Sequence, residues 1–369
     1  MRIWMRRTLA AVLVMSLLLS GSVVFATEPT APQPTQAPSE TVPPETAAAT
    51  EAPTEEPTEV PTEEPTEPEP TAPAYEVDTS TKMYKVCAEA ASGMSYDQLL
   101  VYDATNDKLI FSDSREGSKL YPASVTKLYS AWVALQIMEP DEIVTVGDEL
   151  DLVHAGSSVA SIRKEQRPYV RNLVEGMMLP SGNDAAIVLA VAAGRKLAKD
   201  ENLDPEEAMY TFVDEMNRKG KELGFKRSHF ANPDGWHSGS HYTCLDDMII
   251  IAKLALSDST ISRYIRRAED EVTFASGQTF TWQNTNKLLN EEEAYYRSSA
   301  IGMKTGYTRQ AEQCLMAAYR CSDGRTLVIG VFGYADGNKR YSEINKLAKA
   351  CTEQIKQEVK EAKAAEKKK

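Results

Sequence analysis

The sequence predicts an α+β domain whose sheet is assembled from distant parts of the chain. Residues 96–113 read as a β-hairpin, because two strand-like runs flank an Ala-Thr-Asn-Asp turn. Residues 300–334 contain three further strand patterns, and the stretch between the two regions is mainly helical. Strands at both ends with helices between them indicate an α+β arrangement.

The first 26 residues carry the pattern of a secretory signal peptide. Three arginines precede an uncharged apolar run from Leu9 to Leu19, and small or apolar residues ending at Ala26 offer a cleavage site. An uncleaved membrane anchor is the alternative, because the run from Thr8 to Ala26 approaches spanning length. Both interpretations predict export.

Residues 27–74 are predicted to form a disordered Pro/Thr/Glu-rich linker. They hold 13 of the 19 prolines and 11 glutamates but no lysine or arginine, and one seven-residue unit occurs at both 53–59 and 61–67. They contain too few apolar residues for a core, and proline and like charge extend the chain. A specific binding motif or a glycosylated stalk is the alternative. Most of the net charge of −13 therefore lies in this linker. The acidic balance of the chain argues against a nucleic-acid partner, because binding to phosphates calls for a basic surface.

Residues 75–355 are predicted to form one folded domain, long enough for a single large core. The strand pattern at 313–320 and that at 326–334 are joined by a Ser-Asp-Gly turn. An apolar stripe through Ile355 and Val359 indicates a C-terminal helix, whose charged end is the segment at 356–369. This basic end is interpreted as solvated, with weak contact to membrane or wall polymer as the alternative. Helices are expected at 124–138, 170–193 with a break at 180–183, 205–223, and 243–256, the last opened by a capping box of Thr243 and Asp246.

The five cysteines lack the spacing of a zinc site. Cys244, Cys314 and Cys351 fall in apolar patterns and are interpreted as small core residues. A bridge between Cys314 and Cys321 across the last hairpin is conceivable, but few or no disulfides are favoured. No metal or other cofactor is expected.

Ser124 and Lys127 form a Ser-x-x-Lys sequence at the start of a predicted helix. Their spacing places both side chains on one helical face. A neutral lysine there can remove the serine proton, provided that burial or another cation lowers the lysine pKa. The motif alone is weak, because it occurs by chance in chains of this length.

Two other short motifs contain complementary groups. In the helix break, Ser181 can relay a proton to a leaving amine, and Asn183 can hold a substrate carbonyl and position Lys127. Capping of the next helix is the simpler interpretation of either residue. On the strand at 300–308, Lys304 and Thr305 can bind a carboxylate. Lys304 can also lower the pKa of Lys127 by like charge, and Gly306 allows close backbone approach.

Taken together, the three motifs in this order make the chain resemble the serine-type D-alanyl-D-alanine carboxypeptidases, the low-molecular-weight penicillin-binding proteins. The resemblance covers roughly residues 96–333. Two residues depart from the family pattern, since Asp234 stands where histidine is frequent and Glu312 where glycine is usual. The matching segments are YPASVTKL (121–128), LPSGNDAA (179–186), HFANPDGW (229–236), SHYT (240–243), NTNKLL (284–289) and IGMKTGYT (301–308).

The resemblance implies an antiparallel sheet with helices on both faces and an all-helical cluster, the penicillin-binding/β-lactamase-like transpeptidase fold. It implies that Ser124 is acylated with Lys127 as its base, and that Ser181 and Asn183 serve proton transfer and substrate placement. Backbone N–H groups of Ser124 and Tyr307 would form an oxyanion hole, typically worth about 3 kcal/mol per donor. The substrate residues would be Asn183, Lys304, Thr305, Gly306 and Tyr307.

The implied activity is removal of the terminal D-alanine from peptidoglycan pentapeptide stems, at the cell wall or the outer face of the cytoplasmic membrane, with penicillin as a covalent inhibitor. A β-lactamase is one alternative. It needs a deacylating glutamate, and the matching position here is Asn286. A non-catalytic peptidoglycan-binding module is the other, and the complete set of motif residues weighs against it.

Overall fold

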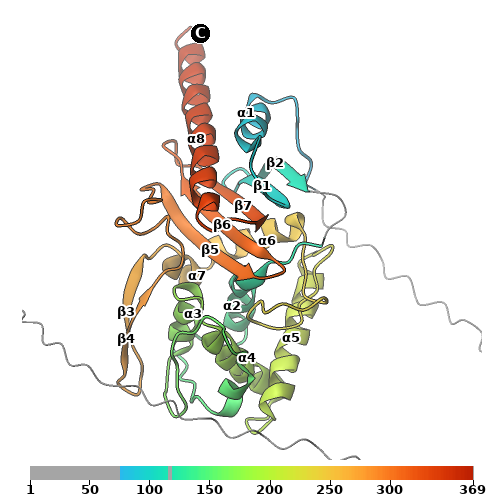
Figure 1. The fold of residues 1–369 in the computed structure, drawn as a ribbon, viewed down its shortest axis with the longest axis vertical. Helices are drawn as coiled ribbons and strands as arrows, with labels where there is room; N and C mark the ends of the chain where they lie inside the picture. The colour runs from blue at the N-terminus through green and yellow to red at the C-terminus, as the bar shows by residue number, and fades with distance from the viewer. Residues whose placement is uncertain (1–74, 115–118, 369) are drawn as a thin grey trace, which may run out of the picture. The chain divides into compact units, whose positions relative to one another are not determined.

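A five-stranded antiparallel sheet lies at the centre of the computed structural model, which describes residues 75–114 and 119–368 (Figure 1). The strand order is β2-β1-β7-β6-β5, so the first hairpin pairs directly with the last strand. The α+β class and the predicted hairpins are confirmed. The strands are β1 Gln98–Asp103, β2 Lys108–Ser114, β5 Ala300–Thr308, β6 Glu312–Arg320 and β7 Thr326–Tyr334.

The strands of this sheet supply side chains to two separate cores. In β1, Leu99 and Val101 belong to one core, whereas Leu100 and Tyr102 belong to the other. This division follows the two-residue period of an extended chain. All four side chains are fully buried, so β1 has no face in contact with solvent.

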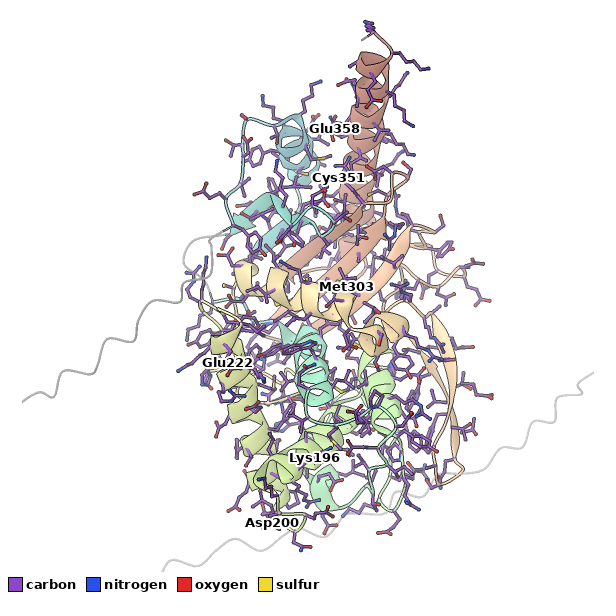
Figure 2. All side chains as sticks on the ribbon, turned by 180° about the vertical axis from the view of Figure 1, so that it is seen from behind. Lys196, Asp200, Glu222, Met303, Cys351 and Glu358 are labelled. Carbon is purple, nitrogen blue, oxygen red and sulfur yellow. The ribbon has the colours of Figure 1, made fainter. Side chains whose placement is uncertain are left out.

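Helices cover both faces of the sheet, as the family resemblance implies (Figure 1). On one face α1 (Lys82–Ala91) packs against α8 (Lys339–Glu366). The helical cluster covers the other face, and Figure 2 shows Met303 of β5 where α6 passes the sheet. The cluster consists of α2 Lys127–Leu135, α3 Val170–Met178, α4 Asn183–Ala198, α5 Pro205–Glu222, α6 Leu245–Ser257 and α7 Ser259–Tyr264.

The expected capping box at the start of α6 is wrong. The residue that caps this helix is Cys244, and no side chain makes a capping hydrogen bond there. Thr243 instead pairs through its backbone with Leu120, and its hydroxyl contacts the Ser228 hydroxyl at 2.7 Å. Because Thr243 takes part in this long-range bridge, it is still extended. The helix cap therefore lies at Cys244, one residue later than the sequence pattern indicates.

All five cysteines are buried and none forms a disulfide, which confirms the expected core positions and the low disulfide content. The disulfide considered between Cys314 and Cys321 is not formed. Seven residues of extended chain span about 23 Å, far beyond disulfide reach, and the two side chains enter opposite cores. The close pair is Cys87 of α1 and Cys351 of α8, whose sulfur atoms are 3.3 Å apart. Figure 2 labels Cys351 on α8, with Glu358 farther along the helix.

Several predicted boundaries and segments differ from the structure or lie outside it. Instead of one helix over 124–138, a 3-10 turn at Ala123–Thr126 precedes α2. By contrast, α8 extends to Glu366, as the predicted charged helix end requires, and Ile355 is its last fully buried apolar position. The predicted signal segment and linker lie outside the described residues. Among the helices that are described, none combines the length and apolarity needed to cross a membrane.

Elements that were not predicted are α1, α7 and a separate hairpin of β3 (Glu269–Thr273) and β4 (Thr279–Gln283).

Candidate active site

Ser124 lies in the 3-10 turn that leads into α2, where β5 and a loop approach it from two sides. Ala123, just before it, has a left-handed backbone with φ of 48°. The space around the turn depends on glycines. A Cβ atom on Gly306 would lie 3.1 Å from the Ser124 nitrogen, and one on Gly235 would lie 1.9 Å from the Ala123 oxygen. Glycine at 306 therefore makes room for the Ser124 turn itself, a reason that the sequence did not reveal.

Lys127 is completely buried beside Ser124. Its ammonium donates hydrogen bonds to Ser124 Oγ at 2.9 Å, to Asn183 Oδ1 at 2.7 Å and to the Asp234 carbonyl oxygen at 2.7 Å. Burial lowers the pKa of Lys127 to about 8, although the charges of Asp234 and Asp184 partly oppose the shift. The predicted contact of Ser124 with Lys127 is thus present, although Ser124 lies in the 3-10 turn and Lys127 is the first residue of α2.

The helix break between α3 and α4 brings Ser181 and Asn183 to the same place. The helix-capping interpretation is wrong for both residues, because Gly182 occupies the cap position and no side chain caps α4. Asn183 holds Lys127 through its oxygen and donates from Nδ2 to Ser157 Oγ at 3.0 Å. Ser181 has a left-handed backbone with φ of 62° and lines the neighbouring cavity. Within the described residues, no hydrogen bond joins it to Lys127.

Lys304 and Thr305 come to this site from β5. Lys304 is completely buried, and its ammonium donates to the Thr305 carbonyl oxygen at 3.0 Å. Burial, followed by the positive charges of Lys127 and Arg340, holds the pKa of Lys304 well below its usual value. The expected like-charge interaction between the two lysines lowers the pKa of Lys304, whereas burial is the cause that lowers the pKa of Lys127. Both lysine pKa values are lowered, but the charges of Asp234 and Asp184 partly offset the shift of Lys127.

Arg340 and Thr285 are parts of the site that sequence reasoning missed. Thr285 Oγ1 lies 2.6 Å from Thr305 Oγ1. Arg340, in the first turn of α8, donates to the Cys314 carbonyl oxygen at 2.8 Å and to the Gly306 carbonyl oxygen at 3.4 Å. It is 7% exposed, and its Nε has no hydrogen-bond partner. No motif distinguishes Arg340 from other arginines, because only the packing of α8 on the sheet brings it here.

A cavity of about 510 Å³ connects these groups. Of the predicted residues, Lys127 and Lys304 lie behind its surface. Trp236 and His237 also line it, and they stack on His154 and contact the edge of Tyr121, respectively. The predicted residues that line the cavity are Ser124, Ser181, Asn183, Thr305, Gly306 and Tyr307.

The two departures from the family pattern occupy defined positions. Asp234 is 2% exposed, and its carboxylate accepts a hydrogen bond from the Trp236 N–H at 3.2 Å. Glu312, at the start of β6, has φ of 51°, a conformation that glycine adopts without strain. The charge of Asp234 raises the pKa of Lys127, whereas Glu312 lies where the turn after β5 leads into β6.

Comparison with known proteins gives one consistent family. The family model of peptidase S11, D-alanyl-D-alanine carboxypeptidase, matches residues 85–335. The carboxypeptidase DacF of Bacillus subtilis is 28% identical over 64% of this chain and 57% of its own length. The Streptomyces K15 carboxypeptidase is 31% identical over 61% of this chain and 76% of its own length.

The solved structure of the Streptomyces K15 DD-transpeptidase superimposes with a TM-score of 0.62 at 26% identity, over 70% of this chain and 97% of that one. The aligned region spans little more than half the length of DacF and of the Escherichia coli carboxypeptidase DacD. The fold is therefore that of the penicillin-binding transpeptidases, and the chain belongs to the peptidase S11 family of D-alanyl-D-alanine carboxypeptidases.

Proposed function

We propose that this protein is a D-alanyl-D-alanine carboxypeptidase that removes the terminal D-alanine from peptidoglycan stem peptides through an acyl-enzyme on Ser124. The observation that carries the proposal is the 2.9 Å contact between Ser124 Oγ and the buried amine of Lys127. A pKa of about 8 leaves roughly a tenth of Lys127 neutral at pH 7, which suits a general base. The substrate implies that the enzyme works outside the cytoplasmic membrane.

The reaction begins when neutral Lys127 removes the Ser124 proton and Ser124 Oγ attacks the carbonyl carbon of the penultimate D-alanine. The N–H groups of Ser124 and Tyr307 stabilise the resulting oxyanion. Ser181 passes its proton to the amine of the terminal D-alanine as the peptide bond breaks and receives the proton that Lys127 took from Ser124, so that Lys127 is neutral again. Water, deprotonated by the same lysine, then hydrolyses the ester, and Ser124 recovers its proton.

The terminal carboxylate of the substrate is assigned to the region of Thr305 and Arg340. Thr305 supplies a hydroxyl and Arg340 a nearly buried guanidinium, and both line the cavity. A guanidinium pairs well with a carboxylate in a partly desolvated site. Lys304 acts from behind the strand, where its amine donates a hydrogen bond to the Thr305 carbonyl oxygen and supports the strand.

A β-lactamase is the second candidate, and Asn286 argues against it. This residue is fully buried, and its side-chain oxygen accepts a hydrogen bond from the Leu288 N–H. An amide held in a turn cannot deprotonate a deacylating water. β-Lactam antibiotics are therefore expected to act as acylating inhibitors.

Purified full-length protein is expected to release D-alanine from a synthetic pentapeptide that ends in D-Ala-D-Ala. It is also expected to retain bound penicillin much longer than one peptide turnover. Released D-alanine and the decay of the penicillin adduct are measured in parallel, with Ser124→Ala as the control. Absence of D-alanine release from the wild type would refute the carboxypeptidase proposal, and rapid penicillin turnover would favour the lactamase.

The charge of Asp234 is expected to set the pH at which Lys127 becomes an effective base. The isosteric change Asp234→Asn removes a negative charge that raises the pKa of Lys127, so this pKa falls. Because the base must be neutral, the rising limb of the acylation rate moves to lower pH, by on the order of one unit. The pH profile of penicillin acylation measures this shift.

The matched control for Asp234→Asn is Asp200→Asn, at the far end of the helical cluster (Figure 2). This change is expected to leave the profile where it is. An unchanged profile for Asp234→Asn, or a shift to higher pH, would contradict the assigned effect of Asp234.

A further inference from the structure

The cavity has a one-sided charge. Its lining includes the arginines Arg309 and Arg340 but no aspartate or glutamate. This contrasts with the net charge of −13 for the whole chain. A cleft lined by one sign of charge attracts and orients ligands of the opposite sign. The cavity therefore suits a ligand that carries more than one negative group.

The two arginines occupy different environments. Arg340 is nearly buried and fixed by the carbonyl oxygens of Gly306 and Cys314. Arg309 follows the end of β5 at Thr308 and is exposed. No ion pair joins Arg309 to a carboxylate in the part of the chain that the structure describes. Its charge thus remains available to a ligand at the open end of the cavity.

The spacing of the two arginines fits a peptide. Arg340 contacts the backbone of Gly306, and Arg309 comes three residues later, at most about 11 Å along the chain. In an extended substrate, the residue before D-Ala-D-Ala lies about 7 Å from the terminal α-carbon. Its side chain adds several ångströms more. A substrate whose terminal carboxylate lies at Arg340 can therefore bring a side-chain carboxylate of that residue to Arg309.

We propose that Arg309 binds a free carboxylate on the residue that precedes D-Ala-D-Ala, so that the preferred stem peptides carry a diamino diacid at that position. A lysine there presents only an ammonium group, for which the cavity lining offers no acidic partner. Amidation of the carboxylate removes the charge that Arg309 recognises. This inference rests on the proposed carboxypeptidase function and names its substrate class.

The test uses three synthetic pentapeptides that differ only in the residue before D-Ala-D-Ala. This residue is diaminopimelate, its carboxamide or lysine. For the wild type at low salt, kcat/KM is expected to be about two- to fivefold higher for the free acid than for the amide, mainly through KM, as for a partly exposed ion pair. The preference is expected to shrink as salt screens the charges.

Variants at Arg309 separate charge recognition from other effects. Arg309→Gln is expected to equalise the acid and the amide, and Arg309→Glu to reverse the preference toward lysine. The matched control is Gln310→Ala, which changes the neighbouring uncharged lining residue and is expected to retain the preference for the acid. Penicillin acylation, measured for every variant, reports whether the nucleophile is still correctly placed.

The outcomes distinguish this inference from the function on which it rests. Equal kcat/KM values of the wild type for acid and amide would overturn the role of Arg309, as would an unchanged preference in Arg309→Gln. In both cases the carboxypeptidase assignment would stand, because D-alanine is still released. Failure to release D-alanine from all three peptides would instead overturn the proposed function.

Discussion

Replacement of Lys127 by methionine is expected to slow acylation of Ser124 by about 10²- to 10⁴-fold, the usual contribution of a general base. Methionine fills a similar volume but cannot take a proton. The buried Lys127 amine donates hydrogen bonds to both Ser124 Oγ and Asn183 Oδ1. Among the described residues, no other group is hydrogen-bonded to both of these side chains. Stopped-flow measurement with a fluorescent penicillin gives the rate.

The Lys127→Met variant also loses partners for the Asn183 side-chain oxygen and the Asp234 carbonyl, so some loss of stability accompanies it, about 1–3 kcal/mol per unsatisfied group. Thermal unfolding identifies the folded fraction, to which the rate is normalised. The control is Lys196→Met on the surface of α4, whose ammonium pairs with Glu142. A folded Lys127→Met protein that acylates at the wild-type rate would exclude Lys127 as the base.

Gly235→Ala is expected to lower the acylation rate by about 10²-fold, because it displaces the nucleophile from its position. The new methyl group would lie 1.9 Å from the Ala123 carbonyl oxygen and 2.9 Å from the Ser124 nitrogen, so the turn must move. Gly235 also has φ of +82°, which disfavours any side chain. The acylation rate and the free energy of unfolding are measured together.

Substitutions at two other glycines separate the effect of backbone strain at Gly235 from the effect of its close approach to the Ser124 turn. Gly93→Ala places a methyl group at φ of +84° with nothing within 4 Å, so it reports backbone strain alone. Gly239→Ala lies in the same loop as Gly235, also with nothing within 4 Å. Both variants are expected to acylate at nearly the wild-type rate. A similar rate for Gly235→Ala would show that Ser124 does not depend on this close approach.

The elements predicted from the sequence are those with a strong local pattern. The first hairpin and the strands at 300–334 contain apolar runs that end at recognisable turns, and the break after Met178 is marked by Pro180 and Gly182. The hairpin of β3 and β4 was missed although Phe280 and Trp282 alternate with polar residues in β4, because both strands have only five residues and β3 begins with three acidic residues. Such short strands give a weaker signal than the nine-residue strands β5, β6 and β7.

The residues of the candidate site also fall into those that a local sequence motif predicts and those that only the packing of distant segments brings together. Ser124 with Lys127, and Lys304 with Thr305, are close in sequence, so their motifs could be recognised before the structure. Other contacts depend on long-range packing. Arg340 approaches Gly306 only because α8 packs on the sheet, and the Asp234 carbonyl approaches Lys127 only because its loop crosses the start of α2. No local sequence pattern predicts such contacts.

The central claim is that Ser124 is the acylated nucleophile. Full-length protein is incubated with penicillin, its intact mass is measured, and the modified peptide is sequenced by mass spectrometry. One covalent penicilloyl group per chain is expected, attached to Ser124, with none on the Ser124→Ala variant. Absence of an adduct on the wild type, or full labelling of Ser124→Ala, would contradict the claim.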